Sequence, residues 1–300
     1  MGPPMVDDSS RVVVSSSRCE FLYNPSLPSE EEIVSHCVKL SLPRGTSIVD
    51  SSTNSVIAWI KCGPNVSIDE ARTQHWTTNA LREAGVADVQ AARVFHAFTA
   101  EHYGCSIGYI AMEYIDGMDC GSNDVDLAAK AVQALIGLRA PPTATLGHIG
   151  GGTKSIVHSF FPEWLPSVDY RTDKDFYDHI HNIFKFLRIE FRGDISSHGR
   201  FICPSDFNSG NFLKRTMEGG RLAVVLLDFL ATCFMPLPFI EVALKKARDS
   251  FSQSVAKKIT YTHGRSDDAK ALLLASGPLI QYGTRPIALP PGVSRRINGR

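Results

Sequence analysis

The sequence predicts an α+β fold with two lobes, a small N-terminal lobe built on an antiparallel sheet and a larger helical C-terminal lobe. Up to about residue 115, short β-type runs alternate with two helical stretches. From about residue 124 onward, most apolar patterns have helical spacing. The change falls at EYIDG, residues 113–117. With 300 residues, the chain is long enough for one large domain or two modest ones.

Local signals define the elements of the N-terminal lobe. Ser29 and Glu32 have the spacing of a capping box and predict the start of a first helix. Gly85 is placed to close a second helix. Two β-type runs are separated only by SST, as in a hairpin. The predicted elements are a helix over 29–40, strands over 46–50 and 54–61, a helix over 67–85, and strands over 90–98 and 106–114.

In the C-terminal lobe, Phe176, Ile180, Ile183 and Phe184 recur at helical spacing and indicate one buried helix face. One β-type region interrupts the helical patterns, with a glycine-rich turn between its two runs. The segment 141–171 is rich in loop residues. The predicted elements are helices over 124–139, 172–191, 239–257 and 266–281, and β-type runs over 201–213 and 222–229.

The organisation expected from these patterns has four parts. Residues 1–27 are rich in serine and proline and are predicted to be disordered or loosely packed. The N-lobe is predicted over 28–115 and the helical C-lobe over 116–285. A basic tail over 286–300 follows them.

Composition excludes several classes of function. Lysine and arginine number 31, as do aspartate and glutamate, so a protein that acts by neutralising nucleic acid or anionic lipid is not expected. No apolar run approaches the about 18 residues of a membrane span. The seven cysteines are scattered without a CxxC pair, which suits a reducing compartment. We therefore expect a cytoplasmic protein that acts on a small molecule, without a nucleic-acid or membrane partner. Its oligomeric state is not predicted.

Polar residues at the ends of apolar runs predict the chemistry. Asp206 and Asn211 form a D-x-x-x-x-N motif after one short strand, and Asp228 ends the next apolar strand. Phosphoryl transfer needs a proton acceptor near the attacking hydroxyl and oxygen ligands for Mg²⁺. Asp206 is the candidate base, and Asn211 and Asp228 are the candidate metal ligands. Alternatively, Asn208 and Asn211 are turn residues that bind their own backbone.

A cation for nucleotide phosphates is also available. The strand VIAWIK ends at Lys61, nine residues before Glu70 in the next helix. A strand lysine held by a helix glutamate can orient the phosphates of ATP. Two other interpretations stay open: Glu70 completes a capping box with Ser67, or Lys61 is an ordinary lysine at a strand end.

The order of these motifs resembles the aminoglycoside phosphotransferase and choline-kinase-like branch of the protein-kinase-like fold. The resemblance spans about 46–245 and is carried by Lys61, Glu70, MEYIDG, SDFNSGN and LLDF. It implies a two-lobed cleft that binds ATP and magnesium. The roles that it implies are phosphate binding by Lys61, held by Glu70; a hinge at 113–117 whose Glu113, Tyr114 and Ile115 bind adenine through the backbone; catalysis by Asp206; and magnesium binding by Asn211 and Asp228.

The chain departs from that family pattern at three places. After Asp228 it has Phe229 and Leu230, without the glycine of the protein-kinase triplet. Where the family has H-G-D, this sequence has Pro204 and Ser205 before Asp206, and proline offers no hydrogen-bond donor. His198 is one candidate to replace the missing histidine. The connection 50–55 contains no glycine, so close backbone approach to phosphates would depend on its serines and threonine.

Three functions follow from these observations. The leading one is an ATP- and Mg²⁺-dependent phosphotransferase that acts on a hydroxyl of a small molecule. The alternatives are a kinase-fold protein with other chemistry, such as secondary-metabolite cyclisation or proton transfer, and a pseudokinase that only binds its ligand. The aromatic-rich stretch 160–170 is expected to contact the acceptor, and GHIGGGTKS, 147–155, to form a flexible loop over the cleft.

Overall fold

The computed structural model describes residues 13–191, 193–260, 267–281 and 289–293. The chain divides into two compact units. Unit 1 comprises Met1–Ala71 and Ala92–Tyr114, and unit 2 comprises Arg72–Ala91 and Ile115–Arg300. This division falls next to the predicted one at 115 but assigns 72–91 to unit 2, where β4 pairs with β10. The four-part organisation stays a prediction, and most of the tail at 286–300 lies outside the described residues.

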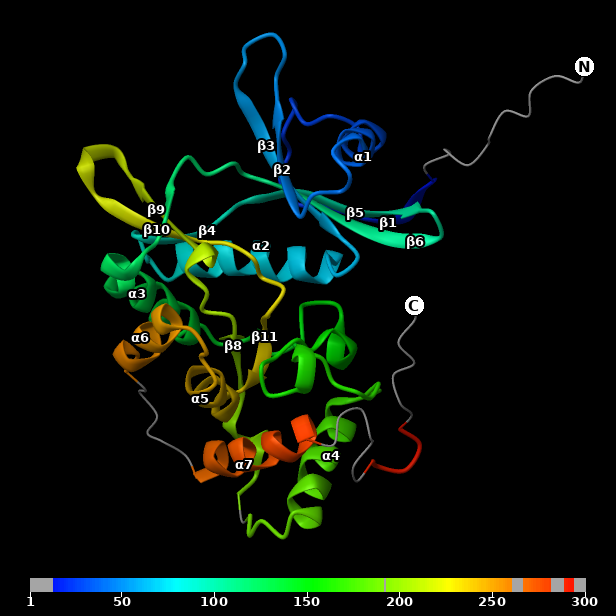
Figure 1. The fold of residues 1–300 in the computed structure, drawn as a ribbon, viewed down its shortest axis with the longest axis vertical. Helices are drawn as coiled ribbons and strands as arrows, with labels where there is room; N and C mark the ends of the chain where they lie inside the picture. Colours follow the sequence, from blue (N-terminus) through cyan, green and yellow to red (C-terminus); the bar gives the residue numbers. More distant parts are fainter. Residues whose placement is uncertain (1–12, 192, 261–266, 282–288, 294–300) are drawn as a thin grey trace, which may run out of the picture. The chain divides into compact units, whose positions relative to one another are not determined.

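Unit 1 is built on a five-stranded antiparallel sheet with α1 packed against it (Figure 1). The predicted capping box is present, because Ser29 Oγ accepts from the Glu32 amide and the Glu32 carboxylate accepts from the Ser29 amide. Ile33, Val34 and Cys37 of α1 are buried against the sheet. In sheet order the strands are β1 (Val13–Glu20), β5 (Val94–His102), β6 (Cys105–Met112), β3 (Val56–Gly63) and β2 (Gly45–Val49), and α1 covers Glu30–Lys39.

The first strand lies within 1–27, the stretch predicted to be disordered or loosely packed. Residues 13–20 form β1 and pair with β5. The run VVSSSRCE shows no alternation of apolar and polar side chains, so its sequence gives no strand signal. The strand instead depends on backbone pairing, which requires no particular side chains.

Unit 2 combines a four-stranded sheet, a two-stranded ladder and most of the helices (Figure 1). The larger sheet has the order β4 (Val89–Ala91), β10 (Leu222–Leu226), β9 (Phe212–Thr216) and β7 (Met118–Asp119). The ladder pairs β8 (Arg200–Pro204) with β11 (Thr232–Pro236). The helices are α2 (Ile68–Glu83), which crosses the division after Ala71, α3 (Val125–Ile136), α4 (Asp173–Phe186), α5 (Leu237–Lys245), α6 (Ser250–Lys258) and α7 (Asp267–Gln281).

Short 3₁₀ turns join these elements at η2 (Ser122–Asp124), η3 (Gly152–Ser155), η4 (Pro162–Trp164), η5 (Ile195–His198), η6 (Ser209–Asn211) and η7 (Glu218–Gly220). The helix predicted over 239–257 is two helices. Asp249 caps α6 by accepting from the Ser252 amide at 2.9 Å, and this cap starts a new helix where continuous periodicity was expected.

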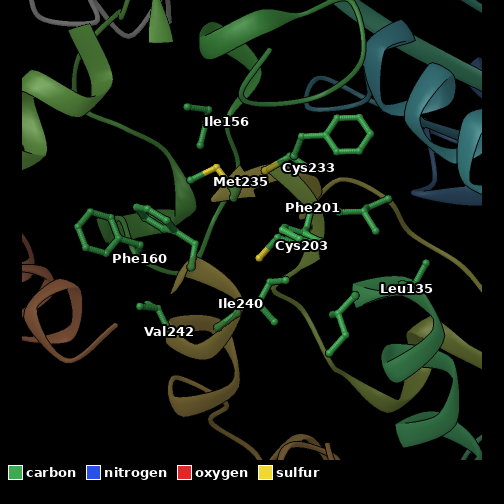
Figure 2. Packing of buried hydrophobic residues seen from close by; sticks show 14 of the residues in the cluster. Leu135, Ile156, Phe160, Phe201, Cys203, Cys233, Met235, Ile240 and Val242 are labelled. Carbon is green, nitrogen blue, oxygen red and sulfur yellow. The ribbon is translucent and has the colours of Figure 1, made fainter. Parts of the chain in front are cut away.

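The core of unit 2 surrounds the β8–β11 ladder (Figure 2). Cys203 and Cys233 lie directly opposite each other on the two strands, and both are fully buried. Ile240 of α5 and Phe160 pack into the same cluster. This packing fixes the strand that ends at Pro204, two residues before the predicted catalytic aspartate. Within the described ranges, none of the helices combines the length and the apolar character needed to cross a bilayer.

Candidate active site

Two of the predicted site residues meet at one end of the β9–β10 hairpin. Phe212 pairs with Leu226, so Asn211 comes directly before β9, and Asp228 follows β10 by two residues. The Leu227 amide donates to the Asn211 carbonyl at 2.9 Å and extends the pairing by one residue beyond the strands. The start of one antiparallel strand thus lies beside the end of its neighbour, which places Asn211 close to Asp228.

Asp206 reaches the same place from the β8–β11 ladder. Pro204 lies opposite Thr232, and both the amide and the hydroxyl of Ser205 donate to the Ala231 carbonyl, at 2.9 and 3.1 Å. Asn211 Nδ2 donates to the Asp206 carbonyl at 3.3 Å. Asp206, Asn211 and Asp228 line one hollow, whose remaining wall is mostly apolar residues of α3, β9 and β10. The structure therefore brings the predicted catalytic residue and the two predicted metal ligands together.

Both carboxylates of this hollow face solvent. Asp206 and Asp228 are exposed, and Asn211 is half-buried. Asp228 has a positive φ of 52°, a conformation that costs a non-glycine residue about 1 kcal/mol and needs support from its surroundings. Part of that support is local, because the Leu230 amide donates to Asp228 Oδ1 at 3.2 Å.

The asparagines of the motif differ in their use. Asn208 caps the turn η6, since its side-chain oxygen accepts from the Gly210 amide at 3.0 Å. The Asn208 amide in turn donates to Asp206 Oδ1 at 3.1 Å. The turn interpretation therefore fits Asn208. Asn211 uses its amide nitrogen on the Asp206 carbonyl, so its side-chain oxygen is the atom suited to a cation.

Asp206, Asn211 and Asp228 offer oxygen atoms, which are the ligand type that Mg²⁺ takes in proteins. Among the described residues, no three His, Cys, Asp or Glu side chains are grouped to hold an ion. Mg²⁺ instead binds one or two carboxylates and completes its shell with water and substrate phosphates. Two exposed carboxylates and an amide oxygen around one hollow match that pattern.

In unit 1 the predicted ion pair is formed. Lys61 Nζ donates to Glu70 Oε1 at 2.5 Å. The Lys61 side chain is 16% exposed and that of Glu70 is 0% exposed. Ser67 Oγ accepts from the Glu70 amide at 3.1 Å, so the backbone of Glu70 is capped while its carboxylate binds the lysine. Capping by Ser67 and contact with Lys61 were alternatives for Glu70 in the sequence; in the structure Glu70 makes both interactions.

The predicted hinge contains the division between the units, which falls between Tyr114 and Ile115. The Glu113 amide donates to the Arg93 carbonyl at 2.8 Å, and its carboxylate accepts from Arg93 Nε at 3.0 Å. Tyr114 is 41% exposed, and its ring lies 6.5 Å from that of Trp59. Ile115 is buried. Glu113 therefore bonds to Arg93 where β5 and β6 meet the hinge, and Tyr114 is the most solvent-exposed residue of the three.

The glycine-free connection between β2 and β3 is held by hydrogen bonds among its own residues. Asp50 Oδ1 accepts from the amide and the hydroxyl of Ser52, at 2.8 and 2.7 Å. These bonds lower the pKa of Asp50, with the Ser52 hydroxyl as the largest cause. The amide and hydroxyl of Ser52 are therefore already committed to a carboxylate within the turn.

Two further expectations concern 160–170 and 147–155. Phe160 and Tyr170 are fully buried and belong to the core, so any contact of 160–170 with an acceptor would depend on its other residues. In 147–155, Gly147 pairs with Phe234 through both of its backbone groups, at 3.0 and 2.8 Å, and Gly152–Ser155 form η3. An apolar or glycine-rich stretch without periodicity carries no signal for burial, and tertiary packing decides it.

His198 does not replace the missing histidine. Its Nε2 lies 2.5 Å from Asp268 Oδ2 on α7. Sequence reasoning missed His148, which is buried and whose Nε2 lies 3.1 Å from the carbonyl oxygen of Phe229, directly after Asp228. The two residues lie 81 positions apart in sequence, and a histidine in a glycine-rich run shows no local sign of burial.

No family model matches the chain, and no curated protein sequence matches it. Its structure is similar to several solved phosphotransferases, of the kind that the sequence resembles, at low identities and TM-scores. The predicted α+β fold is confirmed by the sheets and helices of this chain itself. Examples are spectinomycin phosphotransferase APH(9)-Ia with ADP and spectinomycin (14% identity, 79% of this chain and 80% of that chain, TM-score 0.38), a thermostable mutant of aminoglycoside phosphotransferase APH(4)-Ia with ADP and hygromycin B (12%, 83% and 89%, 0.42), and Plasmodium vivax ethanolamine kinase (12%, 84% and 80%, 0.36).

Proposed function

We propose that this protein is an ATP- and Mg²⁺-dependent phosphotransferase that acts on a hydroxyl of a small molecule. The observation that carries the proposal is the hollow lined by Asp206, Asn211 and Asp228. Two exposed carboxylates beside an amide oxygen provide oxygen ligands and a proton acceptor, which are the groups that phosphoryl transfer needs.

Each residue of the hollow has a proposed role. Asp206 accepts the proton of the acceptor hydroxyl as that oxygen attacks phosphorus. Asn211 and Asp228 hold the metal through oxygen atoms. Bound magnesium supplies positive charge that stabilises the phosphates during transfer. Ser205 positions Asp206 through its two hydrogen bonds to the Ala231 carbonyl.

Unit 1 supplies the proposed nucleotide-binding groups. Lys61 binds phosphate oxygens, and Glu70 holds the lysine in place from a fully buried position. Because the Glu113 amide already donates to Arg93, Tyr114 and Ile115 are the stronger candidates for backbone contacts to adenine. We propose a cytoplasmic setting and a small-molecule partner, as the composition predicts.

One observation favours the alternative functions. Asp50 places a carboxylate at the β2–β3 turn and accepts from both donors of Ser52, so these two donors are not free for a phosphate. A protein with this turn that does not transfer phosphate would bind an organic ligand, and it would either catalyse another reaction on that ligand or only bind it. Binding of Mg-ATP distinguishes the phosphotransferase from such a protein.

The test compares thermal melting of the wild type, Asp228→Asn and Asp119→Asn with and without Mg-ATP. Asp119 is an exposed aspartate at the end of β7 outside the hollow, so its variant controls for lost charge. At a hundredfold excess over Kd, binding stabilises the folded protein by about 2.7 kcal/mol. We expect this shift in the wild type and in Asp119→Asn but not in Asp228→Asn. Equal shifts in all three proteins, or none in the wild type, would reject the proposal.

A further inference from the structure

His148 is a buried histidine with a defined bonding role beside the candidate active site. Its side chain is 2% exposed, and Nε2 lies 3.1 Å from the Phe229 carbonyl oxygen. A carbonyl oxygen only accepts, so Nε2 carries the proton and donates. The same oxygen also accepts from the Thr232 amide at 3.0 Å. Two donors thus hold the peptide group that follows Phe229, one residue after Asp228.

The backbone around His148 is fixed from several directions. The His148 amide donates to Ser155 Oγ at 2.8 Å, and the Ile149 amide donates to Thr73 Oγ1 at 2.9 Å. Gly147 has a φ of +93°, and a Cβ there would lie 2.2 Å from the Gly152 carbonyl oxygen. Only glycine fits this position, and it lets the chain pair with Phe234 on one side while presenting His148 on the other.

The segment that His148 holds needs external support. Asp228 is exposed and has a positive φ, whereas the next residue, Phe229, is 1% exposed. A backbone in that region persists when the surrounding structure determines it. Pro204, on the neighbouring strand end, has neither an amide hydrogen nor a side-chain donor to offer. The side chains of His148 and Ser205 both bind backbone carbonyls within 229–231.

We propose that His148 is the positioning residue of Asp228, holding its carboxylate in the orientation that binds the metal–nucleotide complex. This inference rests on the proposed function. It assigns the supporting hydrogen bond to a residue distant in sequence, where Pro204 cannot supply one. Without the bond, the Phe229 peptide group rotates more freely and Asp228 leaves the left-handed conformation for part of the time.

The test uses two nearly isosteric substitutions, His148→Gln and His148→Met. Glutamine keeps a side-chain donor of similar reach, whereas methionine fills the space without one. Binding of Mn²⁺ with ATP is followed by electron paramagnetic resonance, with Asp228→Asn as the variant that loses the ligand. A net hydrogen bond of about 1 kcal/mol corresponds to about fivefold in affinity. We expect His148→Met to weaken Mn²⁺–ATP binding about fivefold and His148→Gln to stay within twofold of the wild type.

Hydrogen exchange of the Thr232 amide provides a readout without any ligand. In His148→Met this amide is expected to exchange several-fold faster than in His148→Gln, because its acceptor carbonyl is less restrained. Equal Mn²⁺–ATP affinity and equal exchange in the two folded variants would overturn the inference.

If the wild type binds no Mn²⁺–ATP, the proposed function fails, and the metal-positioning role of His148 fails with it. The exchange data then show separately whether His148 holds the segment. Should His148→Met not fold, exchange in His148→Gln slower than in His148→Ala supports the bond, and equal exchange overturns it.

Discussion

The ion pair of unit 1 predicts an asymmetric response to substitution. The Glu70 side chain is 0% exposed and that of Lys61 is 16% exposed. Lys61→Met leaves a fully buried carboxylate without the cation beside it, which costs about 3–5 kcal/mol of the free energy of unfolding. Glu70→Gln leaves a lysine that already reaches solvent and keeps a polar neighbour, so we expect a cost of about 1–2 kcal/mol.

The double variant, Lys61→Met with Glu70→Gln, sharpens this prediction. It buries no uncompensated charge, so it is expected to be more stable than Lys61→Met alone by about 2 kcal/mol. Urea unfolding measures all four proteins, and the fluorescence of Trp59 reports on β3, two residues from Lys61. Additive costs, or a cost for Glu70→Gln equal to that of Lys61→Met, would refute the reasoning.

The same double variant separates stability from ligand binding. If Lys61 binds phosphates, the double variant folds but loses affinity for Mg-ATP. If the ion pair only stabilises the fold, the double variant regains both stability and affinity for Mg-ATP relative to Lys61→Met. Calorimetric titration of Mg-ATP into the double variant decides between these outcomes, with Glu70→Gln as the folded control that keeps the lysine.

Two further predictions concern the fold. His158 is buried, and burial is the main cause that lowers its pKa from 6.5 to about 3. Between these values the unfolded chain binds a proton that the folded chain does not, so stability falls by up to about 1.4 kcal/mol per unit as the pH is lowered, and His158→Gln should flatten urea-derived stability over that range. Gly108→Ala should destabilise unit 1 by more than Gly104→Ala in the same assay. A Cβ at Gly108 would lie 2.0 Å from the Val66 carbonyl oxygen, whereas one at Gly104 meets nothing within 4 Å and costs only the strain of its φ of +73°, about 1 kcal/mol; equal costs would contradict the steric argument.

Local signals account for the elements that sequence reasoning found. Ser29 and Glu32 mark the start of α1 because both capping partners lie within one turn. β1 and β11 were not predicted, since each is defined by a partner strand and not by its own pattern. β11 begins at Thr232 in a run that also contains Pro236, and proline within an apolar run lowers any strand signal.

The candidate site also contains some residues that the sequence could predict and others that it could not. Asp206, Asn211 and Asp228 were predictable because each polar side chain ends or begins an apolar run, which is unusual without a functional partner. His148 was not predictable, because its role depends on a carbonyl 81 residues away in the chain. The self-bonded turn at Asp50 was also missed, although an aspartate two residues before a serine is a common turn signal.

These features indicate which part of the proposed reaction this chain supports most strongly. In unit 2, Ser205 and His148 commit buried donors to the backbone beside Asp206 and Asp228, and an unsupported chain would not keep Asp228 at positive φ. In unit 1, the lysine pair is intact, but Ser52 of the β2–β3 turn directs its amide and its hydroxyl to Asp50. For the proposed function we therefore expect weak affinity for the nucleotide together with firmly held Asp206 and Asp228.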